Sequence, residues 1–145
     1  MTTFANNRKA HFDYEILEKY SAGLELTGQE VKSVRSMRMN LRGSFVVVRG
    51  AEAYLVGSEI PAYQPKNAPT DYDSNRPRKL LMSKAELKTL QGVESKKGLT
   101  IVPLSVYNKG RFLKIDIAIA RGKKQFDKRQ AIKKRDTERE IKRSL

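Results

Sequence analysis

The strongest constraint on the fold is a pair of alternating segments late in the chain, residues 100–107 and 112–120. Each places a hydrophobic residue at every second position, which is the period of a β-strand with one buried face. These residues are Val102, Leu104 and Val106 in the first segment and Leu113, Ile115, Ile117 and Ile119 in the second. Residues 108–110, Asn-Lys-Gly, join the two segments as a hairpin. Because Lys114 and Asp116 fall on the opposite face, we predict an antiparallel sheet with one side in water.

Earlier segments predict further strands. Residues 45–48 and 53–56 are rich in β-forming side chains and predict a hairpin in the central part of the sheet. Residues 12–17 and 24–26 alternate in the same way, which predicts two strands bent around residues 22–23.

Two spacings of the capping-box type predict short helices, because a hydroxyl and a carboxylate three residues apart satisfy each other's backbone donors. The first begins at the Thr27 and Glu30 spacing and ends before residues 40–43. Its Val31 and Val34 side chains are expected to face inward, and Lys32, Arg35 and Arg38 outward. The second begins at Ser83 with Glu86 and stops at Gly92.

The remaining segments are expected to be irregular. Residues 60–77 contain four prolines and no apolar period, so they predict a long exposed loop before residues 78–82 return to the core. Residues 2–11 have little to bury and predict a mobile arm. Together these features predict a mainly β fold over residues 1–120, a small antiparallel OB-like barrel with two or three short helices.

Residues 121–145 form a basic tail that carries a net charge of +7, half of the chain's +14. Its few large apolar residues do not form a sustained helical stripe, so we predict a tail that is disordered when free and ordered by a polyanion. No glycine or proline follows Gly122, which favours a helix in the bound form. A solvating tail or a non-specific basic arm is the alternative that the composition leaves open.

The charge and the residue types narrow the function. A pI near 10.1 favours nucleic acid as the partner, with an anionic membrane second. No apolar run approaches membrane-spanning length and no export signal is evident, so a cytoplasmic protein without a membrane partner is expected. The chain has no cysteine, His11 has no evident catalytic partner, and no phosphate-binding glycine motif occurs. We therefore predict that it is not an enzyme and has no metal or cofactor.

Glu30 has two interpretations. The carboxylate is placed to complete the capping box with Thr27. It also lies among Lys32, Arg35 and Arg38, where it could accept hydrogen bonds from base or ribose groups and add selectivity to the affinity that the cations give.

Six segments, taken in order along the chain, resemble the SmpB family of bacterial tmRNA-binding proteins. They are residues 7–10, 22–35 with its G-Q-E-V-K-S motif, 52–55, 78–81, 98–104, and 122–129 with its G-K-K-Q-F-D-K-R motif. The resemblance covers nearly the whole chain. It implies an OB-type barrel that binds the tRNA-like domain of tmRNA, with one copy per RNA, and enters stalled ribosomes so that the nascent chain is tagged.

The resemblance also implies two sets of site residues. The RNA-binding set is Asn7, Arg8, Lys9, Glu30, Lys32, Arg35, Asn40, Lys114, Lys123 and Lys124. The ribosome-binding set, expected at the decoding centre and in the mRNA channel, is Asp127, Lys128, Arg129, Lys133, Lys134 and Arg135. The alternatives are a general ribosome-associated OB-fold RNA-binding protein, which the two motifs disfavour, and a small basic nuclease, which lacks a catalytic pair.

Overall fold

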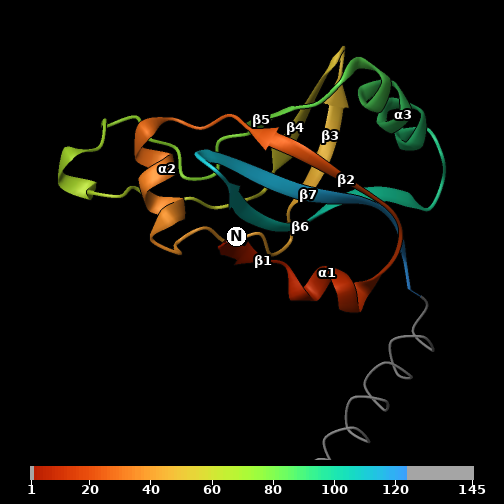
Figure 1. The fold of residues 1–145 in the computed structure, drawn as a ribbon, viewed down its shortest axis with the longest axis horizontal. Coiled ribbons are helices and arrows are strands. Elements are labelled where there is room, and N and C mark those ends of the chain that lie inside the picture. The colour runs from red at the N-terminus through yellow and green to blue at the C-terminus, as the bar shows by residue number, and fades with distance from the viewer. Residues whose placement is uncertain (1, 124–145) are drawn as a thin grey trace, which may run out of the picture.

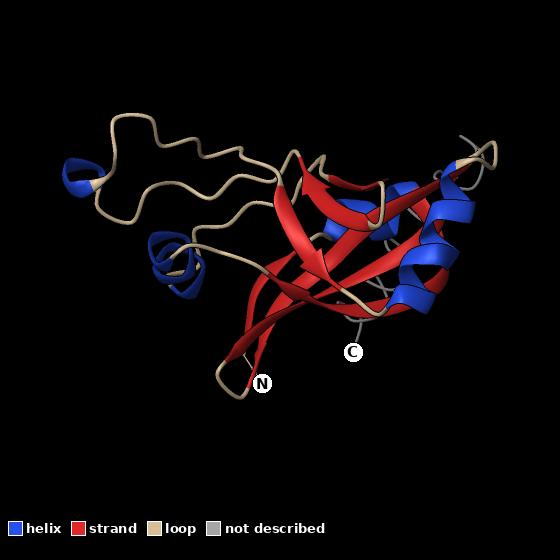
Figure 2. Ribbon diagram, turned by 90° about the horizontal axis from the view of Figure 1, so that it is seen from above, coloured by secondary structure: helices blue, strands red, loops and turns tan. Residues whose placement is uncertain are grey.

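The structure is a computed structural model that describes residues 2–123, so the predictions for residues 124–145 lie outside it. Within the described part, seven strands form one antiparallel sheet in the order β1-β6-β7-β2-β5-β4-β3, which curls into a small barrel (Figures 1 and 2). In chain order the elements are β1 (Thr3–Asn6), α1 (Arg8–Asp13), β2 (Tyr14–Leu24), α2 (Gly28–Arg35), β3 (Phe45–Arg49), β4 (Glu52–Val56), the 3-10 turn η1 (Pro65–Asn67), β5 (Arg78–Leu81), α3 (Lys84–Glu94), β6 (Leu99–Lys109) and β7 (Phe112–Gly122). The predicted mainly β, barrel-like class is confirmed.

The barrel is built on the β6–β7 hairpin that the alternating segments predict. All four predicted inward residues of β7, from Leu113 to Ile119, are buried in the main core. The prediction that Val102, Leu104 and Val106 share one face of β6 is wrong, because the pairing of β6 with β7 shifts between Pro103 and Ser105. This irregularity turns Val106 into the main core, while Val102 and Leu104 face the other side of the sheet.

That other side is not wholly wet, because α1 covers part of it. Val102 and Leu104 of β6 pack there with Ala118 and Ala120 of β7 and Ala10 of α1. On this side of β6 and β7, only the half that carries Lys114 and Asp116 is partly exposed to solvent. The predicted wet face is therefore confined to the end of the sheet next to the β6–β7 turn.

The predicted mobile arm is wrong. Residues 3–6 pair with β6 as β1, and the Asn7 backbone N–H donates to Leu104 O at 2.8 Å. The Asn7 side chain then caps α1 by accepting from the Ala10 N–H at 3.3 Å and donates to Pro103 O at 2.9 Å. A free edge of β6 and one capping amide therefore order a segment whose own sequence has no apolar period. Phe12 lies in α1, and β2 is one continuous strand with a register shift between Ile16 and Glu18.

Both capping boxes are confirmed, with Thr27 and Glu30 opening α2 and Ser83 and Glu86 opening α3. α3 runs two residues beyond the predicted stop at Gly92, to Glu94. The Glu94 carboxylate explains the extension, because it accepts the Val48 N–H at 2.6 Å and pairs with Arg49 at 3.4 Å. The β3–β4 hairpin is also confirmed, but β3 lies at the end of the hydrogen-bonded order rather than in its centre.

α2 ends on a residue in the left-handed backbone region. Met37 has a φ of 64° and is 58% exposed, and the next residue, Arg38, donates its N–H to Ser33 O at 3.2 Å. This is the position where glycine is usual, because a side chain is strained there. The geometry stops the helix abruptly and sends the chain back toward the barrel.

Candidate nucleic-acid interface

Several of the predicted RNA-binding residues meet in one cluster beside α1, the amino-terminal cluster, made of residues 6–9, Asn40 and Arg42. They line an open polar hollow of about 380 Å³. Asn40 pairs with Glu59 through two backbone hydrogen bonds of 2.9 Å, and its side chain accepts the Arg42 N–H at 2.9 Å. The loop that carries Asn40 and Arg42 is therefore fixed against the rest of the barrel.

Within this cluster the residues have different roles. Asn7 is 5% exposed, and its side-chain amide holds α1 and β6 together. Its role in the cluster is therefore to fix the position of the exposed residues. Arg8, Lys9 and Arg42 are exposed and bring three positive charges to the hollow. An adjoining hollow of about 330 Å³ is lined by Lys9 and Arg42 together with the exposed ring of Phe45. Cations beside an exposed aromatic ring are a combination that suits a phosphate and a base.

A second group of cations lies on and beside α2; we call Lys32, Arg35, Arg38 and Arg111 the α2 cationic face. The Lys32 ammonium is 6.0 Å from the centroid of the Tyr63 ring, and Arg38 donates to Tyr63 O at 3.4 Å. Arg35 lies 5.9 Å from the Phe4 ring and donates to Arg111 O at 3.2 Å. These contacts tie the helix to the 60–77 loop on one side and to the β6–β7 turn on the other.

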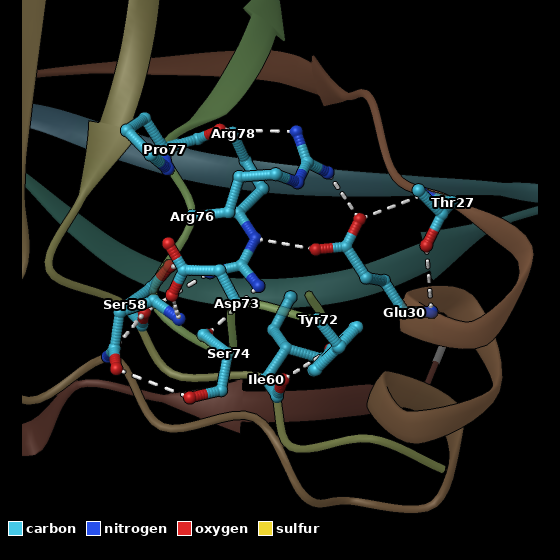
Figure 3. A network of polar contacts seen from close by, with 11 residues as sticks. Thr27, Glu30, Ser58, Ile60, Tyr72, Asp73, Ser74, Arg76, Pro77 and Arg78 are labelled. Atoms are coloured by element: carbon cyan, nitrogen blue, oxygen red, sulfur yellow. Dashed lines mark hydrogen bonds and ion pairs between the residues drawn. The ribbon is translucent and has the colours of Figure 1, made fainter. Parts of the chain in front are cut away.

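Glu30 is buried at the start of α2, with 1% of its surface exposed. Its Oε1 accepts the Thr27 N–H at 2.9 Å and pairs with Arg76, while Oε2 pairs with Arg78 Nε at 2.8 Å. Figure 3 shows the carboxylate between the two guanidinium groups and the beginning of the helix. The capping interpretation of Glu30 is confirmed, and its burial does not favour a direct contact between this carboxylate and RNA.

Arg78 is the centre of this network and is fully buried. Besides Glu30, it donates to Ser58 O at 3.2 Å and to Ser74 O at 3.0 Å. One side chain therefore binds Ser58, just before the 60–77 loop, and Ser74, near the end of that loop (Figure 3). A buried guanidinium needs this many partners, because its charge and its donors would otherwise lose hydration without compensation.

The electrostatics of the network follow from its geometry. Burial alone would raise the pKa of Glu30, but the hydrogen bonds from Thr27, Arg78 and Arg76 outweigh it, and the pKa is lowered. The pKa of Tyr72 is raised, first by burial and then by the nearby Glu30 charge. Glu30 is therefore ionised and Tyr72 neutral at neutral pH.

The other predicted residues are spread more widely. Lys114 is partly buried on the outer side of β7, where it lies opposite Tyr107 of β6 and Gly23 of β2. Lys123 follows β7 and binds the end of α1, since its Nζ donates to His11 O at 3.2 Å and its backbone N–H to Asp13 O at 2.9 Å. Lys124 and the six tail residues Asp127, Lys128, Arg129, Lys133, Lys134 and Arg135 lie outside the described residues.

Sequence reasoning missed Arg42, Arg76 and Arg111 as candidate site residues. Arg42 and Arg111 are next to turns, and Arg76 precedes a proline, so none belongs to a periodic segment. The only available signal was the pair of arginines around Pro77 at the point where the loop re-enters the sheet.

No group of three or more His, Asp or Glu side chains within residues 2–123 is arranged to hold a metal ion. None of the helices described there has the length and the apolar composition needed to cross a membrane.

Comparisons with known proteins agree with one another. The family model described as SmpB protein matches residues 4–145. A protein named SsrA-binding protein from Ligilactobacillus salivarius is 51% identical, over 97% of this chain and 90% of that protein. The protein of the same name from Carboxydothermus hydrogenoformans is 49% identical, over 97% of this chain and 94% of that one. A chain of the solved structure described as "tmRNA-SmpB: a journey to the center of the bacterial ribosome" is 42% identical with a TM-score of 0.68, covering 88% of this chain and 92% of that one.

Proposed function

The chain belongs to the SmpB family, and on this premise we propose that it binds the tRNA-like domain of tmRNA and delivers it to stalled ribosomes for trans-translation. The observation that carries the proposal is the extent of the family match, which includes both the barrel and the basic segment after it. The names of its relatives support an SsrA-RNA ligand, and the solved structure supports a ribosomal setting. A soluble cytoplasmic location follows from these two partners.

We assign the two tasks to different parts of the chain. Residues 1–120 form the barrel that binds the tRNA-like domain, through the amino-terminal cluster and the α2 cationic face. The described part of the chain supports this assignment, because both surfaces combine exposed cations with aromatic rings. Residues 121–145, with Asp127, Lys128 and Arg129 foremost, reach the decoding centre and the mRNA channel. The barrel acts by binding and placing RNA, and no bond is made or broken in it.

Filter binding with two RNAs of similar size tests the first task. The full-length protein should bind the tRNA-like domain of tmRNA more tightly than an ordinary tRNA at the same salt concentration. Equal affinity for the two RNAs would indicate a general ribosome-associated OB-fold RNA-binding protein instead. Magnesium-dependent cleavage of either RNA would indicate a nuclease.

A further inference from the structure

We propose that Arg76 is an additional RNA-binding residue of this protein and that Glu30 acts on RNA through it, as the residue that positions its guanidinium group. The inference rests on the proposed RNA-binding function and deepens it. It extends the RNA-binding surface from α2 onto the 60–77 loop, and it gives Glu30 a role that its burial permits.

Glu30 cannot reach RNA with its own oxygens while the network is intact. One carboxylate oxygen is held by the Thr27 N–H and Arg76, and the other by Arg78. With only 1% of the residue exposed, a base or ribose would have to displace a buried ion pair to reach the carboxylate. Any influence of Glu30 on RNA is therefore transmitted by a neighbour.

Of the three charged side chains in this network, Arg76 is the one that meets solvent. Its side chain is 43% exposed, whereas that of Arg78 is fully buried. A guanidinium carries five N–H donors in a planar fork, and in Arg76 one nitrogen faces Glu30 while another donates to Pro77 O at 3.3 Å. The remaining donors can bind a phosphate. Because Glu30 already orders the side chain, little rotamer freedom is left to lose on binding.

A cavity of about 580 Å³ beside Arg76 has room for a nucleotide. It lies between residues 27–30, at the beginning of α2, and residues 69–76 of the loop, and Pro69 and Tyr72 give it apolar walls. The Tyr72 hydroxyl donates to Ile60 O at 2.6 Å, so the ring is held in place. Asp71 and Asp73 line the same cavity. Carboxylates repel a phosphate but accept hydrogen bonds from ribose hydroxyl and base amino groups, which places the phosphate at Arg76 and the sugar or base edge toward the aspartates.

The loop and α2 already form one continuous surface. At the other end of the loop, Tyr63 lies under Lys32 and its carbonyl accepts from Arg38. The loop is thus fastened to α2 at two points, one at Tyr63 and one at Arg76. Figure 1 shows it extending past α2, away from the barrel, so an RNA that lies on the α2 cationic face also meets the loop.

The test is a salt series of binding measurements on full-length variants, with the tRNA-like domain of tmRNA as the probe. Arg76→Ala should weaken binding about tenfold, the value of one charge-assisted hydrogen bond. It should also reduce the slope of log K against log salt by about 0.7–0.9, the loss of one phosphate contact. Arg76→Lys should keep the slope and lose part of the affinity, because an ammonium cannot bridge Glu30 and a phosphate as a fork does. The matched control is Arg49→Ala. It removes an exposed arginine of β3 that pairs with Glu94 of α3, and it should leave both the affinity and the salt slope unchanged.

A second pair of variants tests whether Glu30 positions Arg76. Glu30→Gln should weaken RNA binding when Arg76 is present and add no further loss in the Arg76→Ala background, at a temperature where all variants are folded. Wild-type affinity and slope in Arg76→Ala would overturn the proposal. An equal loss from Glu30→Gln in both backgrounds would remove the positioning role. Failure of the proposed function would look different, since wild-type protein would then bind ordinary tRNA as tightly as the tRNA-like domain.

Discussion

Replacing Glu30 by glutamine separates two roles that the sequence shows as one. Glutamine can still accept the Thr27 N–H as the third residue of a capping box, so the cap alone predicts a small effect. The structure predicts a large one, because the fully buried Arg78 loses its charged partner at 2.8 Å. Removing one member of a buried ion pair costs about 3–5 kcal/mol, and for a barrel of this size the midpoint of thermal unfolding should fall by about 10–20 °C.

Thermal and urea unfolding followed by circular dichroism measure this effect. The matched control is Glu86→Gln, at the same position of the second capping box, where Ser83 supplies the N–H at 3.2 Å and no arginine among residues 2–123 forms an ion pair with the carboxylate. That change should cost less than about 1 kcal/mol. Equal losses for the two variants would refute the reasoning, since they would show that only the cap matters. The double variant Glu30→Gln with Arg78→Met should recover part of the loss, because it removes the uncompensated charge.

Since the pKa of Glu30 is lowered in the folded state, its ion pairs stabilise the protein above pH 4.5 and are lost as the pH falls below that value. In urea unfolding, the difference in free energy of unfolding between wild type and Glu30→Gln should therefore narrow below pH 4.5. A constant difference would contradict this reasoning. Met37→Gly should raise the free energy of unfolding by about 0.5–1 kcal/mol, because glycine adopts a positive φ without strain and little burial is lost; a lower value in urea unfolding would argue against strain at this position. A chain ending after Lys124 should unfold at the wild-type midpoint and bind the tRNA-like domain with at most a modest loss, yet fail to support tagging in a translation extract with stalled ribosomes; normal tagging would exclude the proposed role of the tail.

Periodicity and capping patterns predicted those elements whose signal is local. The alternating residues of β7 and the two hydroxyl–carboxylate spacings each depend on side chains within a few positions of one another. β1 and α1 were missed because their order comes from partners about a hundred residues away, such as the Pro103 and Leu104 carbonyls that bind Asn7. A strand that completes a free edge needs no apolar period of its own.

The candidate site divides in the same way. The cations of α2 and of residues 8–9 were predicted from charge and resemblance, and the structure places them on exposed surfaces. The burial of Glu30 was not predictable, because it depends on Arg78, a residue that the sequence shows only as the start of a hydrophobic strand. Composition reports how many charges a chain carries, whereas pairing decides which of them remain available to a ligand.

Because Lys123 is bound to the end of α1, this short helix fixes the distance between the amino-terminal cluster and Lys123. Its first residues, Arg8 and Lys9, belong to the amino-terminal cluster, and its last turn holds Lys123, the residue from which the rest of the chain departs. A helix of six residues is about 9 Å long, so the point of departure lies at a fixed and short spacing from the cluster. If RNA is held at one end of this helix, any rotation of that RNA carries the origin of residues 124–145 with it.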